Sequence, residues 1–141
     1  QGMLNHMSGL IAETQLAVSM RSRKRFKLSD YFDNVTGDEA VNLMDVKTRY
    51  ILQREDGRKM EIDLLAESKD NRLIAVEVKK RNKKTGPRII EDFLEKTGLL
   101  KERNPDKTVV PMVLSLGGFT EEAATMCRNK GIGMAEEIKL W

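Results

Sequence analysis

Residues 61–80 read EIDLLAESKDNRLIAVEVKK, and this stretch decides the fold. Two apolar runs flank a polar turn at 69–71, as in a β-hairpin. Each run also carries charge where a buried strand normally has Val or Ile. Asp63 interrupts the first run, and Glu77 and Lys79 interrupt the second. A charge buried in a strand is costly unless it is paired or binds a metal, so these three side chains require an explanation.

Strand and turn patterns extend this hairpin toward the N-terminus. The sequence TRYILQR predicts a strand at 48–54, and the Asp-Gly turn that follows leads to a strand at 59–66. The run at 72–80 is the third strand, so the three are expected to form an antiparallel meander.

Helical and apolar patterns surround the meander. Apolar positions at helical spacing, with a Pro at the start of one segment and a Thr cap with acidic residues at the start of another, predict three helices. Short apolar runs predict two more strands. The expected elements are helices at 8–26, 87–103 and 121–130 and strands at 109–116 and 132–140.

This order predicts an α/β fold with one mixed central sheet, αβββαβαβ, and helices on both faces. The 141 residues suit one domain, 1–141, with 1–7 as a flexible arm or expression remnant, and the chain is compatible with a piece of a longer protein. With 40% apolar and 33% charged residues the composition is that of a globular protein. A single cysteine, Cys127, excludes an internal disulfide and favours a cytoplasmic location, and no apolar run is long enough to span a membrane.

The net charge is +3, and basic residues are concentrated in two runs. Such clusters bind phosphate backbones, while the simpler alternative is a solvated surface. We predict a nucleic-acid partner, DNA first and RNA as the alternative. The residues expected to contact it are Arg23, Lys24 and Arg25 in the first run and Lys80, Arg81, Lys83, Lys84 and Arg88 in the second.

The three strand charges are expected to meet. Side chains alternate along a strand, so Glu77 and Lys79 share a face. If the two strands pair around the turn at 69–71, the residue numbers of opposing positions add up to about 140. Asp63 is then opposite Glu77, with Cβ atoms about 5 Å apart. Two carboxylates at that distance repel unless a positive charge separates them. A hard cation such as Mg²⁺ fits, and Lys79 beside it could hold a phosphate or an attacking water.

Asp63, then thirteen residues, then Glu77-Val78-Lys79 resembles the motif of the PD-(D/E)xK, or restriction-endonuclease-like, nuclease superfamily. The element order from about residue 8 to 140 resembles that fold. The resemblance implies a metal-dependent endonuclease that hydrolyses DNA phosphodiester bonds by metal-activated water, with Mg²⁺ or Mn²⁺. Asp63, Glu77 and the Val78 carbonyl would bind the metal, and Lys79 would be the catalytic lysine. Holliday-junction resolvases and Mrr-like enzymes add a Glu from the first helix, a position that Glu13 matches.

Two features depart from the superfamily pattern. Ile62 stands in place of the Pro, a common variation. The helix after the lysine offers Asp92, Glu95 and Lys96 where many members carry Gln or Tyr. Symmetric cleavage of a duplex would imply a homodimer, and further domains or partner subunits are compatible with the sequence.

Two alternatives compete with a nuclease. The first is a module with the same fold that binds nucleic acid or docks onto a protein without cutting. The second is a structural ion pair of Asp63, Glu77 and Lys79 at a sheet edge. The presence of all three motif residues favours the enzyme.

Overall fold

The computed structural model describes the backbone of residues 2–139 and the side chains of residues 12–139. Its elements follow one another along the chain as helices, strands and one short 3-10 turn, η1. They are α1 (Gly2–Arg23), β1 (Arg25–Phe26), η1 (Leu28–Asp30), β2 (Val41–Gln53), β3 (Lys59–Ser68), β4 (Arg72–Lys79), α2 (Pro87–Arg103), β5 (Thr108–Ser115), α3 (Glu121–Lys130) and β6 (Gly133–Ala135). None of these helices is long and apolar enough to cross a membrane.

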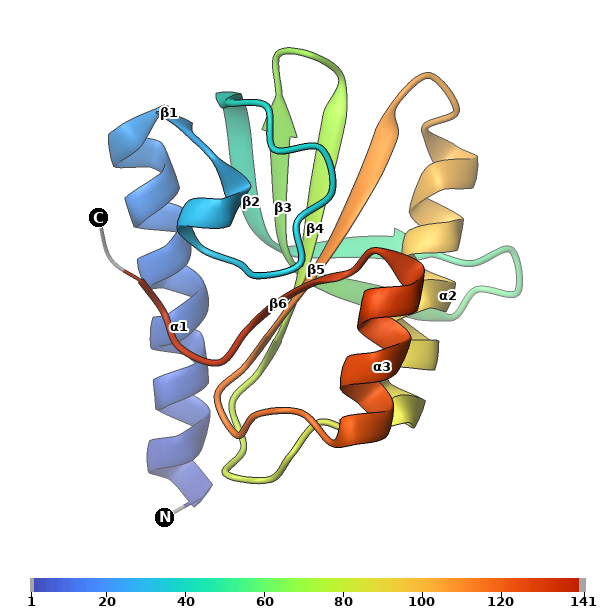
Figure 1. Ribbon diagram of the computed structural model, residues 1–141. Coiled ribbons are helices and arrows are strands. Elements are labelled where there is room, and N and C mark those ends of the chain that lie inside the picture. The colour runs from blue at the N-terminus through green and yellow to red at the C-terminus, as the bar shows by residue number, and fades with distance from the viewer. Residues whose placement is uncertain (1, 140–141) are drawn as a thin grey trace.

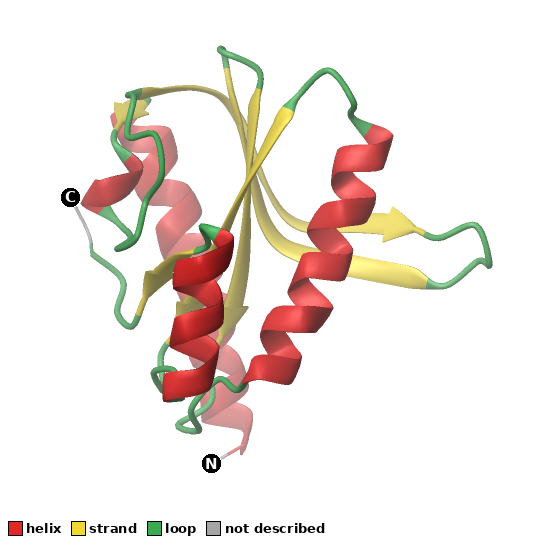
Figure 2. Ribbon diagram, turned by 45° about the vertical axis from the view of Figure 1, so that its right-hand side comes forward, coloured by secondary structure: helices red, strands yellow, loops and turns green. Residues whose placement is uncertain are grey.

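The six strands form one mixed sheet in the order β1-β2-β3-β4-β5-β6. The first four pair antiparallel, whereas β4, β5 and β6 pair parallel. Helix α1 covers one face of the sheet, and α2 and α3 cover the other (Figures 1 and 2). This is the mixed α/β arrangement expected from the sequence.

Two apolar cores lie on the two faces. Alternation along β4 assigns its residues to them: Ile74, Val76 and Val78 pack with α1, whereas Leu73 and Ala75 pack with α2 and α3. The second series continues with Glu77 and then Lys79, so both side chains lie on the face covered by α2 and α3. The charged end of β4 is therefore built into the same layer as α2.

Several boundaries differ from the expected ones. Helix α1 begins at Gly2, so its described backbone includes residues 2–7, for which the sequence predicted an arm. Strand β2 begins at Val41, where β1 supplies a partner that sequence periodicity does not show. Strand β6 is short, because β5 pairs with it only over residues 112–114. The predicted end of this strand at 140 lies outside the described residues.

The hairpin of β2 and β3 turns out of the sheet toward α2 (Figures 1 and 2). Ile62 and Leu64 are two residues apart in β3, and in a regular strand they would face the same side of the sheet. Here Ile62 packs in the core beneath α2 and Leu64 packs in the core beneath α1. Asp63 lies between them. On β2 the same register places Arg49 opposite Asp63, and Arg49 has a positive φ of 54°. Both strands are thus irregular at the position of Asp63, which is half-buried.

The loop at residues 80–86 joins β4 to α2 and carries the second basic run; we call it the basic loop. Its last part is tied to the loop between β5 and α3. The Thr85 N–H donates to the Gly118 carbonyl at 2.8 Å, and the Thr85 and Ser115 hydroxyls lie 2.7 Å apart. Gly117 lies directly against the basic loop: a Cβ there would overlap the carbonyl oxygens of Arg81 and Lys83.

We expect Gly117→Ala to lower the free energy of unfolding by roughly 2 kcal/mol, because backbone atoms cannot retreat as a flexible side chain would. Urea unfolding measures this. The control is Gly98→Ala in α2, where a Cβ meets nothing within 4 Å; it should raise stability by up to about 1 kcal/mol through helix propensity. A Gly117→Ala protein as stable as wild type would contradict the close approach.

Candidate active site

Asp63 lies where the β3–β4 ladder ends. The observed pairs Leu64–Val76 and Leu65–Ala75 confirm the predicted register, and one further step sets Asp63 opposite Glu77. In place of a backbone carbonyl, the Asp63 Oδ2 atom accepts a hydrogen bond of 2.7 Å from the Val78 N–H. The Asp63 carboxylate thereby takes the place of the last backbone acceptor between β3 and β4, and the hydrogen bond holds it against the end of β4.

Glu77 is almost fully buried, with 4% of its surface exposed. Two ammonium groups approach its carboxylate: Lys79 Nζ lies 3.2 Å from Oε2, and Lys96 Nζ lies 3.3 Å from Oε1 and 3.5 Å from Oε2. The lysine side chains are 28% and 20% exposed. The two partly exposed lysines thus both contact a carboxylate that is itself almost fully buried.

Burial raises the pKa of Asp63 to about 7, and the negative charge of Glu77 adds to the effect. The hydrogen bond from the Val78 N–H and the positive charge of Lys96 act in the opposite direction. Two carboxyl groups in one poorly hydrated site cannot both ionise cheaply. The pair therefore gains free energy from an added cation, or from a proton on Asp63 below about pH 7.

Helix α1 supplies a third acid. Glu13 is 7% exposed, and burial raises its pKa, while the positive charges of Lys80 and Arg49 lower it. Glu61 and Glu77 act on it as like charges. The structure thus places Glu13 in the electrostatic neighbourhood of the site. Lys80, expected on a DNA-facing surface, is half-buried on the side of Glu13.

The donor atoms suit a hard cation. Carboxylate and peptide oxygens are the ligands that Mg²⁺ prefers, and Mg²⁺ is usually bound by one or two carboxylates while it keeps several waters. Among the described side chains, no group of three or more His, Cys, Asp or Glu residues is gathered to hold a metal. The oxygen atoms of Asp63, Glu77 and the Val78 carbonyl are of the type that binds Mg²⁺. Glu13 does not form a three-acid group with Asp63 and Glu77.

A cavity of about 360 Å³ lies beside Lys79. The basic loop and the start of α2 line it, and four of the lining side chains are exposed cations: Arg81, Lys83, Lys84 and Arg88. The positive charges therefore surround a hollow that adjoins the strand carrying the lysine. A larger cavity, of about 640 Å³, lies between the β2–β3 hairpin and α2; acidic and basic side chains both line it, so it has no single sign of charge.

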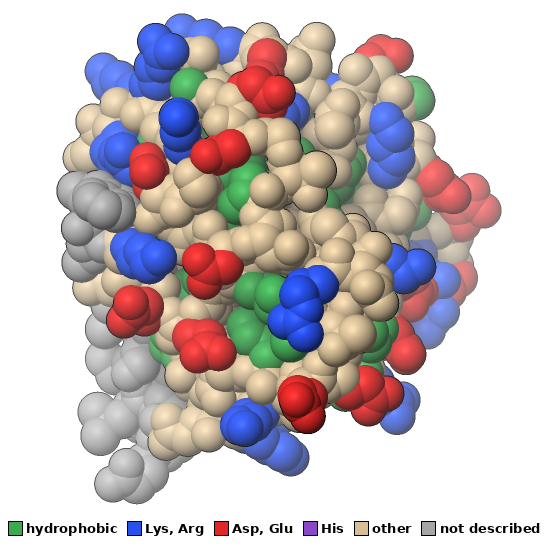
Figure 3. Space-filling model, viewed as in Figure 1, with side chains coloured by type: hydrophobic (Ala, Val, Ile, Leu, Met, Phe, Trp, Pro, Cys, Tyr) green, Lys and Arg blue, Asp and Glu red, His purple; other side chains and the backbone are tan. Residues whose placement is uncertain are grey.

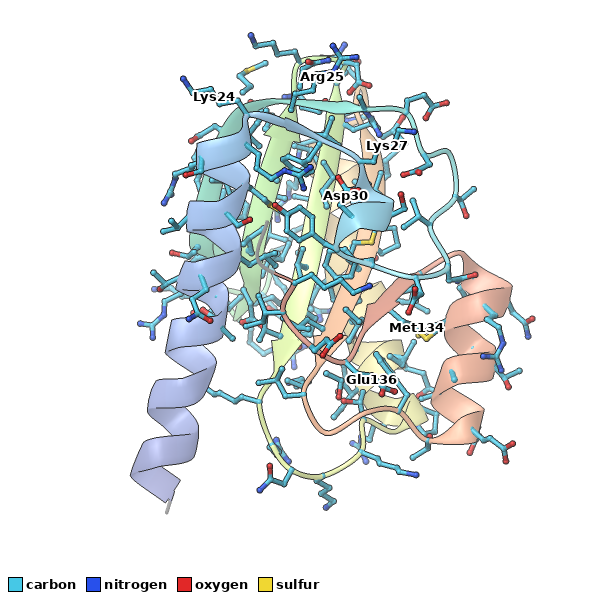
Figure 4. All side chains as sticks on the ribbon, turned by 60° about the vertical axis from the view of Figure 1, so that its left-hand side comes forward. Lys24, Arg25, Lys27, Asp30, Met134 and Glu136 are labelled. Atoms are coloured by element: carbon cyan, nitrogen blue, oxygen red, sulfur yellow. The ribbon has the colours of Figure 1, made fainter. Side chains whose placement is uncertain are left out.

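The first basic run lies at the other end of the sheet. Arg25 pairs with Asn42 at the start of β2, which is the same end of the sheet as the start of β4, whereas Lys79 is at the end of β4. Figure 4 shows Lys24 and Arg25 at the β1 end of the molecule, far from the basic loop. Arg23 binds Asp30 at 2.8 Å and lies over the Tyr31 ring. On the face seen in Figure 3, Lys and Arg side chains gather along the upper left edge, and elsewhere they are interspersed with Asp and Glu.

Lys96 is the site residue that sequence reasoning did not select. It stands three residues after Phe93 and one before Thr97, and both of these are buried on the core side of α2. A lysine beside the buried stripe of an amphipathic helix is a signal that can be read from sequence. What it contacts depends on how α2 packs against β4.

No protein-family model matches the sequence, and no curated protein is recognisably similar to it. Among solved structures, the chain is similar to a protein of unknown function, AF1548, with a TM-score of 0.53 and 23% identity over 64% of this chain and 47% of that one. It also matches a repair endonuclease from Pyrococcus abyssi, with a TM-score of 0.48 and 15% identity over 66% and 40% of the two chains. The match to the EndoMS-dsDNA2 complex has a TM-score of 0.46 and 15% identity, and it covers 67% of this chain and 38% of that one.

The aligned part is less than half the length of each of these proteins. At 23% identity, the likeness to AF1548 concerns the fold alone. Since one fold hosts many activities, the function of this chain must be argued from the residues of its own site.

The raised pKa of Asp63 predicts how stability depends on pH. A carboxyl whose pKa is higher in the folded than in the unfolded chain favours folding while it is protonated, and this contribution is lost as the pH rises through the folded value. In metal-free buffer, Asp63→Asn should therefore gain stability relative to wild type by roughly 2–4 kcal/mol between about pH 4 and about pH 8. Asn can still accept the Val78 hydrogen bond.

Urea unfolding in EDTA across this range measures the difference. The control is Asp70→Asn, because a hydrogen bond from Arg72 lowers the pKa of Asp70 to about 2. Its effect on stability should stay nearly constant over the same range, since Asp70 is ionised in the folded chain throughout. A constant difference for Asp63→Asn as well would mean that burial does not hold Asp63 protonated.

Proposed function

We propose that this chain is a metal-dependent nuclease of the PD-(D/E)xK type that hydrolyses DNA phosphodiester bonds by metal-activated water. One observation carries the proposal: Asp63 and Glu77 face each other where the β3–β4 ladder ends, with Lys79 Nζ 3.2 Å from Glu77. This is the geometry in which the motif residues can act together.

Asp63, Glu77 and the Val78 carbonyl are the proposed ligands of Mg²⁺ or Mn²⁺. A bound cation would lower the pKa of a water and offset charge on the phosphate. The Val78 N–H fixes one carboxylate of the pair, and burial holds the other. Lys79, on the same face as Glu77 and partly exposed, is placed to donate a hydrogen bond to the scissile phosphate or to orient the attacking water.

The basic loop is the proposed binding surface for the DNA backbone next to the site. Its cations line a hollow beside Lys79, so a strand held there would bring a phosphate near the two acids. The first basic run, at the far end of the sheet, would contact the same DNA only if a long duplex crossed the molecule.

A non-cutting module with the same fold is the alternative, in which Lys79 and Lys96 only neutralise Glu77. The pKa of Asp63 argues against a purely structural ion pair. Lys79 and Lys96 both form their ion pairs with Glu77, whereas burial raises the pKa of Asp63 to about 7. A site selected only for stability gains nothing from a second, half-buried acid whose pKa is raised.

Cleavage of labelled plasmid and branched DNA in Mg²⁺, in Mn²⁺ and in EDTA tests the proposal. Asp63→Asn, Glu77→Gln and Lys79→Ala should each cut at least about 100-fold more slowly than wild type while still binding DNA. Lys59→Ala, an exposed lysine at the start of β3, is the matched control and should cut normally. If Lys79→Ala cuts at the wild-type rate, the nuclease proposal is wrong. If the wild-type protein binds DNA but does not cut it, the non-cutting module is favoured.

Salt dependence tests the DNA-binding surface. Replacing Arg81, Lys83 and Lys84 together with Ala should flatten the slope of log affinity against log salt by up to about 0.9 for each phosphate that the variant no longer binds. The control replaces three exposed lysines elsewhere, Lys59, Lys69 and Lys130. Equal slopes for the two triple variants would assign the basic loop to another role.

A further inference from the structure

Lys96 of α2 approaches the same carboxylate as Lys79 does. Its Nζ lies within 3.5 Å of both Glu77 oxygens, and its charge also lowers the pKa of Asp63. It thus acts on both acids of the candidate metal site. No part of the PD-(D/E)xK motif in this sequence accounts for a second lysine here.

The balance of charge shows why this contact is exchangeable. Glu77 carries one negative charge, and Lys79 alone can neutralise it. Lys96 supplies a second positive charge to the same carboxylate, so Glu77 has one more ammonium group than its charge requires. A divalent cation bound by Asp63 and Glu77 would leave an excess of positive charge, and Lys96 would be repelled.

The contact geometry agrees with an exchangeable partner. Charge-assisted N–H···O⁻ bonds are typically about 2.7–2.9 Å long. Both Lys96 contacts, at 3.3 and 3.5 Å, are longer than that, and its side chain is 20% exposed. The ammonium can therefore leave Glu77 without becoming a buried cation that has no partner, because part of the side chain already reaches solvent.

We propose that Lys96 is a second lysine of the active centre, which holds Glu77 in the metal-free protein and turns to the phosphate of the substrate when a divalent cation binds that carboxylate. The proposal rests on the proposed nuclease function. The site then has two cationic groups, on β4 and on α2, on the solvent side of Glu77. When metal and substrate are bound, the ammonium groups of Lys79 and Lys96 would pair with a phosphodiester of the nucleic acid.

The first test measures metal binding without nucleic acid. Lys96→Met should bind Mn²⁺ roughly tenfold more tightly than wild type, because the competing charge is removed. Lys96→Arg keeps the charge and should bind as wild type does. Electron paramagnetic resonance of free Mn²⁺ gives the affinities. The control is Lys101→Met, because Lys101 in the same helix binds the carbonyls of Pro105 and Lys107, away from the site.

The second test measures cleavage at saturating Mn²⁺. Lys96→Met should cut about 100-fold more slowly, and Lys96→Arg should recover most of the rate. Tighter metal binding combined with slower cutting is a result that a merely structural lysine does not produce. Circular dichroism establishes that each variant is folded.

Other results overturn the inference. Weaker Mn²⁺ binding by Lys96→Met would mean that Lys96 only orients Glu77 as a ligand, and an unchanged cutting rate would exclude a contact with the phosphate. If wild type neither binds Mn²⁺ nor cuts, the proposed function itself fails. If wild type does both and Lys96→Met behaves identically, only the role of Lys96 fails.

Discussion

The hydrogen bond from the Val78 N–H to the Asp63 carboxylate is the contact on which the site depends. It forms at the last step of the β3–β4 ladder, where a backbone carbonyl would otherwise accept. A side chain in that place ends the ladder, fixes the carboxylate and leaves its second oxygen for another partner. Val78 lies between Glu77 and Lys79, whose side chains alternation along β4 places together on the face covered by α2.

Burial and charge compete at this position, and the competition gives the site its chemistry. An ionised acid on a covered face is costly without a positive partner, and Glu77 has two, Lys79 and Lys96. Both of those ion pairs go to Glu77, and the pKa of Asp63 rises to about 7. The site therefore favours an added positive charge near neutral pH. A purely apolar strand end would be more stable and would have no chemistry.

The arrangement of elements also separates the two basic runs. The meander places β1 at the same end of the sheet as the start of β4, so the first run lies at the opposite end of the sheet from the basic loop. Only the second run adjoins the acids, and the loop between β5 and α3 holds it there through Thr85 and Gly117. Clusters that look equivalent in sequence are unequal in space.

The sequence by itself determined the local part of this structure. Strands joined by short turns leave little choice of register, so the opposition of Asp63 and Glu77 and the shared face of Lys79 follow from counting residues. The tertiary structure alone decided which side chains arrive from other layers: Lys96 is nineteen residues from Glu77, and its contact requires α2 to pack on β4. The surroundings of Glu13 likewise depend on α1 crossing the other face. Such contacts are set by how two cores fill space, and no periodicity within one element encodes that.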